Sequence, residues 1–145
     1  FGVERAQLKG AVTWRRSEVT DPLTGERREI SGLHPIDWTA GFSQDLPAWK
    51  LVWGVDAVGA YRERWFRFSE VETRKISTWV VVFAEYKPRP DWILRVEALG
   101  ASLRNAKRIR EVYAGRRDDP LLHDFDDIRD LEWGGHLNVR LRKLF

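Results

Sequence analysis

The sequence predicts an all-β protein made of antiparallel, up-and-down strands. Apolar residues recur at every second position in several segments, and clusters of turn residues separate those segments. Because a strand points alternate side chains to opposite faces, each segment has one apolar face and one polar face. The length of 145 residues fits one unit, taken as residues 1–145.

The first predicted strand covers residues 6–14. Its even positions are uncharged, whereas Arg5, Lys9 and Arg15 occupy odd positions. Alternation returns in five later segments: 36–43, 51–61, 78–87, 92–99 and 133–141. About six strands are therefore expected, with the second face of 51–61 lined by small side chains.

The intervals between these strands alternate between short and long. Residues 45–48 and 87–91 form short turns, and the two prolines of the second turn are expected to keep it outside a central strand. The polar stretches 17–28, 62–75 and 113–120 are expected to be long loops or strand ends in water. Residues 101–113 fit a basic helix or an extended segment, and we favour the extended one.

Asp119-Pro120 fits a helix N-cap followed by proline, or an extended connection. We again favour the extended reading.

Composition and motifs argue against catalysis, cofactors and nucleic acid. The chain has no cysteine, a net charge of +3 and no run of 18 apolar residues. His34, His123 and His136 are far apart and lack metal-ligand spacing. A group of aspartates is better explained as a solvated loop than as a calcium site; it comprises Asp118, Asp119, Asp124, Asp126, Asp127 and Asp130. No catalytic motif supports a β-sheet enzyme.

The alternation is also typical of a membrane β-barrel. Outer-membrane barrels have short turns on one side and long loops on the other, with aromatic residues at both interfaces. Here the short-turn side has Phe42, Trp49, Tyr86, Trp92 and Phe145, and the long-loop side has Trp14, Tyr61 and Trp65. The fold class we predict is therefore an antiparallel up-and-down transmembrane β-barrel, represented by about six of its strands.

The C-terminus has a pattern of its own. Counting back from Phe145, alternate positions hold Leu141, Val139 and Leu137, with Lys143 where an apolar residue is usual. This resembles the terminal-strand signal that the outer-membrane barrel assembly machinery reads. We therefore expect Leu137, Val139, Leu141 and Phe145 to act as an assembly signal, and lipid to contact the first three.

Several segments together resemble the late barrel strands of TonB-dependent outer-membrane receptors. The segments are FSQDLP at 42–47, LVWGVD at 51–56, VFAEYKP at 82–88, LRVE at 94–97 and VYAG at 112–115, followed by the final strand. Such receptors have a barrel of about 22 strands with a plugged lumen. The resemblance implies that the chain is the C-terminal end of a larger barrel and that the plug is absent. Because about eight strands are the usual minimum for a membrane barrel, we expect a fragment, a split subunit or a chain completed by a partner.

The resemblance further implies energy-coupled uptake across the outer membrane of a Gram-negative cell. The expected cargo is an iron chelate such as a siderophore complex, cobalamin, another metal complex or a glycan. The expected partners are outer-membrane lipid, the remainder of the barrel and plug, the barrel assembly machinery, and the TonB system acting through the plug.

Residues expected to face the lumen, and candidates for contact with the ligand, are charged: Arg5, Lys9, Arg15, Asp56, Arg62, Arg95 and Glu97. Pairing with neighbouring side chains is the simpler expectation for Arg95 and Glu97. The alternative function is a soluble all-β ligand-binding domain that buries its apolar faces. A helix layer or second sheet over residues such as Leu8, Val82 and Val139 would favour that alternative.

Overall fold

The larger sheet contains six antiparallel strands. Their order in the sheet is β1 (Ala6–Trp14), β4 (Ile36–Leu46), β5 (Leu51–Val58), β8 (Trp79–Arg89), β9 (Trp92–Leu99) and β12 (His136–Lys143). This computed structural model describes residues 5–100 and 104–144. The predicted all-β class and antiparallel up-and-down order are confirmed, and the bounds of β1 match the predicted strand.

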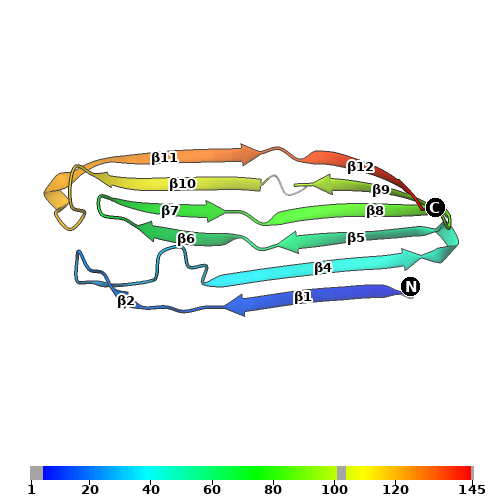
Figure 1. The fold of residues 1–145 in the computed structure, drawn as a ribbon, viewed down its shortest axis with the longest axis horizontal. Helices are drawn as coiled ribbons and strands as arrows, with labels where there is room; N and C mark the ends of the chain where they lie inside the picture. Colours follow the sequence, from blue (N-terminus) through cyan, green and yellow to red (C-terminus); the bar gives the residue numbers. More distant parts are fainter. Residues whose placement is uncertain (1–4, 101–103, 145) are drawn as a thin grey trace.

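A second sheet has four antiparallel strands, ordered β11 (His123–Trp133), β10 (Arg104–Tyr113), β7 (Glu70–Ile76) and β6 (Tyr61–Phe66). These strands continue the lines of β12, β9, β8 and β5, so the two sheets form one long curved layer (Figure 1). A short hairpin of β2 (Val19–Thr20) and β3 (Arg27–Arg28) lies in the long connection between β1 and β4.

Of the two alternatives expected for residues 62–75, the loop is wrong and the strand ends are correct, although Glu63 and residues 70–73 are buried and not in water. This stretch is mainly the hairpin of β6 and β7, in which Arg62 lies opposite Lys75 and Glu63 opposite Arg74. Charged residues can form a strand when ion pairs to its neighbours compensate them, and a reading of single segments misses those partners. The extended reading of 101–113 is confirmed for Arg104–Tyr113, and residues 101–103 lie outside the described part.

The turns also differ from expectation. β8 runs through Pro88 to Arg89, although a turn was predicted over 87–91. The Lys87 N–H bonds to the Lys50 carbonyl on the β5 side, so position 88 faces β9, where the irregular pairing requires no N–H from Pro88. The register between β8 and β9 shifts between Tyr86 and Arg89.

Two single-turn helices occur at connections. One covers Pro47–Trp49 in the predicted 45–48 turn, and the other covers Pro120–Leu122. Asp119 caps the second by accepting a hydrogen bond of 3.0 Å from the Leu121 N–H. The helix-start reading of Asp119-Pro120 is therefore correct, and the extended reading that we favoured is wrong for this turn.

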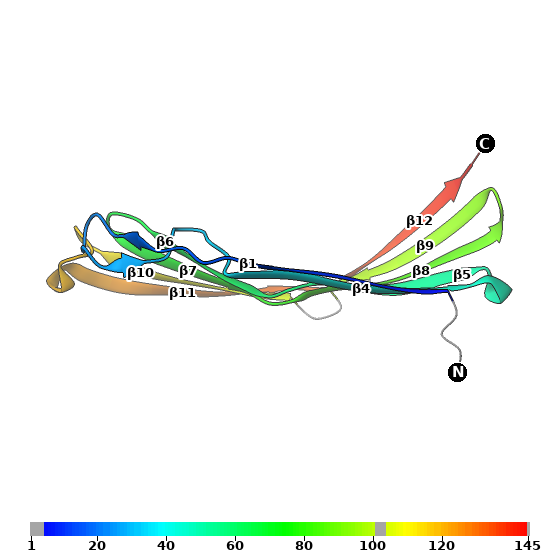
Figure 2. The ribbon, with the colours of Figure 1, turned by 90° about the horizontal axis from the view of Figure 1, so that it is seen from below.

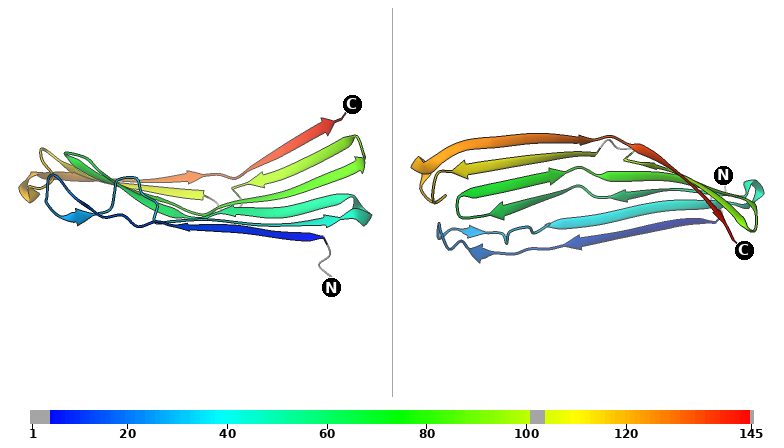
Figure 3. Two further views of the ribbon diagram at one scale, coloured as in Figure 1. Left: turned by 60° about the horizontal axis from the view of Figure 1, so that its bottom comes forward. Right: turned by 45° about the horizontal axis from the view of Figure 1, so that its top comes forward.

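The layer has little hydrophobic core. Among the described residues, only Val71, Ile93 and Ala106 are buried hydrophobic residues. Seen from the side, the strands lie in one layer, and the two views of Figure 3 agree (Figures 2 and 3). The described strands form open sheets in which no barrel closes. No helix in this part of the chain is long and apolar enough to cross a membrane.

Candidate functional site: two faces of the sheet

One face of the six-stranded sheet is apolar from edge to edge. In register across the strands it carries Leu8, Phe42, Val55, Val82, Ala98 and Leu137. Two residues further along each strand, a second row carries Gln44, Trp53, Ala84, Val96 and Val139. Gln44 is satisfied because its Oε1 accepts a hydrogen bond of 3.3 Å from Trp53 Nε1. We call this surface the apolar face.

Nothing in the described chain covers the apolar face. Leu8 is 82% exposed and Val12 75%, both on the edge strand β1. The predicted assembly residues Leu137, Val139 and Leu141 share this face on β12 and are also exposed. Phe145, the fourth, lies outside the described residues.

Apart from Lys143 at the end of β12, the charged side chains of the same sheet occupy the opposite face, which we call the polar face. Lys9 Nζ lies 3.4 Å from Asp56 Oδ1, and Arg5 lies 3.8 Å from Asp45. In the middle strands, Arg95 donates to Glu97 at 2.6 Å and lies 3.5 Å from Glu85. The polar face therefore carries ion pairs between strands, such as Lys9 with Asp56 and Arg95 with Glu85, and one within β9, Arg95 with Glu97.

The structure brings together some of the predicted lumen-facing residues. Lys9 pairs with Asp56, and Arg95 with Glu97, as the sequence reading of Arg95 and Glu97 expected. Arg15 lies beyond the end of β1 and pairs with Asp37 instead.

Arg5 precedes β1, where it pairs with Asp45, and Arg62 lies in β6, in the second sheet. No single pocket collects all seven predicted residues.

On β8 the polar face is more enclosed than the apolar face. On β8, the side chain of Glu85 is 19% exposed, whereas its neighbour Tyr86, on the apolar face, is 43% exposed. A protein folded around an interior in water has the reverse arrangement, because exposed apolar surface costs free energy. The apolar face is thus a surface that requires an apolar partner.

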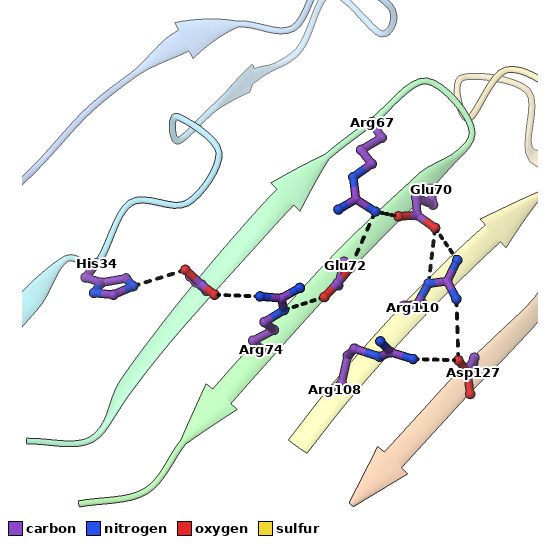
Figure 4. A network of polar contacts seen from close by, with 9 residues as sticks. His34, Arg67, Glu70, Glu72, Arg74, Arg108, Arg110 and Asp127 are labelled. Atoms are coloured by element: carbon purple, nitrogen blue, oxygen red, sulfur yellow. Dashed lines mark hydrogen bonds and ion pairs between the residues drawn. The ribbon is translucent and has the colours of Figure 1, made fainter. Parts of the chain in front are cut away.

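The four-stranded sheet carries an ionic network that the sequence analysis missed (Figure 4). At one end, His34 Nε2 lies 3.0 Å from Glu63, which lies 3.7 Å from Arg74. Arg74 also donates to Glu72, and this bond raises the pKa of Arg74. Contacts between strands in this network join residues that are far apart in the sequence. Only the register between the strands could have predicted these contacts.

At the other end of the network, Arg110 connects two carboxylates. It donates to Glu70 at 2.5 and 3.1 Å and lies 3.6 Å from Asp127, which Arg108 also approaches at 3.4 Å. The hydrogen bonds from Arg110 hold the pKa of Glu70 below its ordinary value, although partial burial opposes this. Glu70 and Glu72 are both buried, and guanidinium groups of Arg67, Arg74 and Arg110 lie against the two carboxylates.

A second missed group, the Asp21 cluster, holds three connections together and comprises Asp21, Arg28, Arg117 and Phe66. Asp21 is 1% exposed and accepts hydrogen bonds from both arginines and, at 2.8 Å, from the Leu23 N–H. The guanidinium carbons of Arg28 and Arg117 lie 4.5 and 5.6 Å from the Phe66 ring centroid. The long connection after β1 is thereby fastened to the β6–β7 hairpin and to the loop after β10.

The histidines and aspartates considered for metal binding are dispersed. Asp118 pairs with Arg116, Asp119 caps the helical turn, and Asp126 lies 3.1 Å from His123. Within residues 5–100 and 104–144, no group of three or more His, Cys, Asp or Glu side chains is placed to hold a metal ion.

No protein-family model, curated protein or solved structure matches this chain. The function is therefore inferred from the two faces of the sheet.

Proposed function

We propose that the chain is part of the wall of an outer-membrane β-barrel, namely the last strands of a TonB-dependent receptor. The observation that carries this proposal is the uncovered apolar face, which crosses all six strands of the larger sheet. Strands of about 9–11 residues, tilted, cross a bilayer. Those of the larger sheet have 8 to 11 residues, which supports a membrane-crossing role.

Polarity along the strands supports a membrane boundary near the junction of the two sheets. Counting alternate residues from β5 into β6 assigns Val55, Ala57, Tyr61 and Glu63 to one side. The row through Tyr61 also contains Ile76, Ala106 and Leu131, whereas the next row contains Glu63, Arg74, Arg108 and Arg129. Apolar side chains thus give way to charged ones within one row on four neighbouring strands.

In this proposal the polar face lines the lumen and the four-stranded sheet extends beyond the outer surface of the membrane. The remaining barrel strands would pair with the free edges of β1 and β12. The plug, coupled to the TonB system, would occupy the lumen, and the assembly machinery would recognise β12 together with the terminal residue Phe145. The cargo would be a scarce nutrient such as an iron chelate, cobalamin, another metal complex or a glycan.

Paired cysteine variants test which face meets lipid. The natural sequence has no cysteine, so Val139→Cys and Asn138→Cys each introduce one label site, on opposite faces of β12. Each variant, expressed in a Gram-negative host, is labelled with bimane in outer-membrane vesicles. Quenching by lipids with brominated acyl chains is then compared.

We expect strong quenching of the label at position 139 and weak quenching at position 138. Equal quenching at the two sites would contradict the proposal. Recovery of a folded, monomeric chain in the soluble fraction would also contradict it and would favour the soluble all-β binding domain.

A further inference from the structure

A groove lies where the four-stranded sheet meets the six-stranded one. Its volume is about 680 Å³, and it crosses β6, β7, β10 and β11. Residues from both sides of the sheet line it. Tyr61, Ile76, Ala106 and Leu131 belong to the side that carries the ionic network of Figure 4, and the opposite side contributes Ala60, Arg62, Lys75, Ser77, Asn105, Lys107, Asp130 and Glu132.

Three cations lie side by side across the groove. Arg62 is directly opposite Lys75, and Lys75 is directly opposite Lys107. Like charges directly opposite each other in a sheet destabilise it, because their side chains are close. On the other side of the same strands the cations of the network have carboxylate partners. The groove thus differs from the rest of this sheet in leaving positive charge uncompensated.

The uncompensated charge is concentrated at β6 and β7. Lys107 Nζ lies 3.8 Å from Asp130, but neither Arg62 nor Lys75 has an ion pair or hydrogen bond within the described part of the chain. Arg64, two residues after Arg62 on the same side of β6, lies outside the groove, and its guanidinium carbon is 4.9 Å from the Phe66 ring centroid. The acidic residues of the groove, Asp130 and Glu132, lie on β11 at its far end.

The floor next to these cations leaves room for a ligand. Ala60 has a small side chain, and Ser77 contributes a hydroxyl whose oxygen accepts a hydrogen bond of 2.8 Å from the Asn105 N–H. The hydroxyl hydrogen of Ser77 can therefore be donated to another acceptor. Two cations and a hydroxyl around an open space match an oxyanion with several acceptor oxygens.

We infer that this groove binds a small ligand through an anionic group, a carboxylate or a phosphate, held between Arg62 and Lys75. Binding at the groove requires no membrane. That the groove faces the lumen, and that the anionic group belongs to the transported nutrient, rests on the proposed function.

Calorimetry with two probes, citrate and inorganic phosphate, tests this inference on the purified full chain, in detergent or in buffer as its solubility requires. The unsubstituted chain should bind at least one probe, more weakly at high salt, and the probe that binds identifies the chemical class. The double variant Arg62→Gln/Lys75→Gln should weaken binding by at least ~10-fold, because it removes two charged donors. Lys50→Gln, which removes a cation from the turn between β4 and β5, outside the groove, should bind as the unsubstituted chain does.

A variant that fails to fold is recognised by its thermal unfolding, and Arg62→Lys/Lys75→Arg then serves as the folded partner that retains both charges and should retain binding. The inference fails if neither probe binds the unsubstituted chain, or if the double glutamine variant binds as tightly. The lipid-quenching experiment is unaffected by either result, so this inference and the proposed function fail independently.

Discussion

Replacing Asp21 with asparagine should release the long connection between β1 and β4 from the rest of the protein. The Asp21 carboxylate accepts hydrogen bonds from Arg28 and Arg117 and from the backbone N–H groups of Leu23 and Thr24, at 2.8 and 3.2 Å. Asparagine retains an oxygen for one or two of these donors but loses the negative charge. Two guanidinium groups would then lie close together without a counter-charge.

The loss follows from the burial of the cluster. The side chains of Asp21 and Arg117 are 1% and 7% exposed, so little solvent screens the unpaired charge. Breaking a buried ion pair by removing one partner costs about 3–5 kcal/mol. Because Asp21→Asn leaves two arginines unpaired, we expect a cost of at least the lower value. About 3 kcal/mol raises the open population of the connection roughly 100-fold.

Limited trypsin digestion measures this opening, because Arg27 and Arg28 are cleavage sites within the connection. We expect much faster cleavage there in Asp21→Asn than in the unsubstituted chain. Asp118→Asn is the matched control, since it removes a carboxylate paired with Arg116 from the neighbouring loop, where both side chains are more exposed. Equal cleavage rates for Asp21→Asn and the unsubstituted chain would refute the reasoning.

Acid provides a second check on the same cluster. Burial opposes ionisation of Asp21, but the hydrogen bonds from Arg117, Leu23, Arg28 and Thr24 outweigh it and hold the pKa of Asp21 well below its ordinary value. A lowered carboxyl pKa contributes stability that is complete above the unfolded-state pKa and is lost progressively as pH falls from that value to the folded-state value. The Leu23 N–H, which bonds to Asp21, should therefore remain protected from hydrogen exchange at pH 4, and its loss of protection by pH 4 would contradict the assigned pKa direction.

Three further predictions concern other parts of the sheet. Val139→Arg should destabilise the membrane-inserted protein by about 2–4 kcal/mol if position 139 is near mid-bilayer, whereas Asn138→Arg should not; urea unfolding in lipid vesicles measures the difference. Gly54→Ala should destabilise by roughly 1–3 kcal/mol, since a Cβ there would lie 2.5 Å from the Phe42 carbonyl oxygen, whereas Gly134→Ala meets nothing within 4 Å; thermal melting that ranks them equally would be inconsistent with this contact. Because Arg110 lowers the pKa of Glu70, the stabilisation lost in Glu70→Gln should be constant from pH 7 to pH 5 and should shrink only below the ordinary value of 4.5, as melting curves across this range would reveal.

Strand positions and faces were predictable where one face lacks charge. Residues 6–14 illustrate this, because shifting the pattern by one residue would exchange Leu8 and Val12 for Lys9 and Thr13. The periodicity could not choose between a loop and strand ends at 62–75, where charges fall on both faces of the strands. There the strands are stabilised by ion pairs between neighbouring strands, such as Glu63 with Arg74. Such pairs cannot be recognised from the periodicity of one segment.

The candidate site was predictable only in part for the same reason. The sequence analysis selected Lys9, Asp56, Arg95 and Glu97, and all four lie on the polar face. It also selected Arg62 but had no means of finding Lys75 and Lys107 beside it. Which residues of two neighbouring strands lie directly opposite each other depends on the lengths of the turns between the strands and on bulges such as the one after Tyr86.

The sequence by itself determined the all-β class, the up-and-down order and which side chains share a face within each strand, because alternation is a local property of extended backbone. Tertiary structure alone decided which charges meet. Asp21 and Arg117 are 96 residues apart in the chain, yet they form one buried ion pair. Such a pair depends on the registers of several strands between them, and those registers are set by hydrogen bonding and side-chain contacts across the whole sheet.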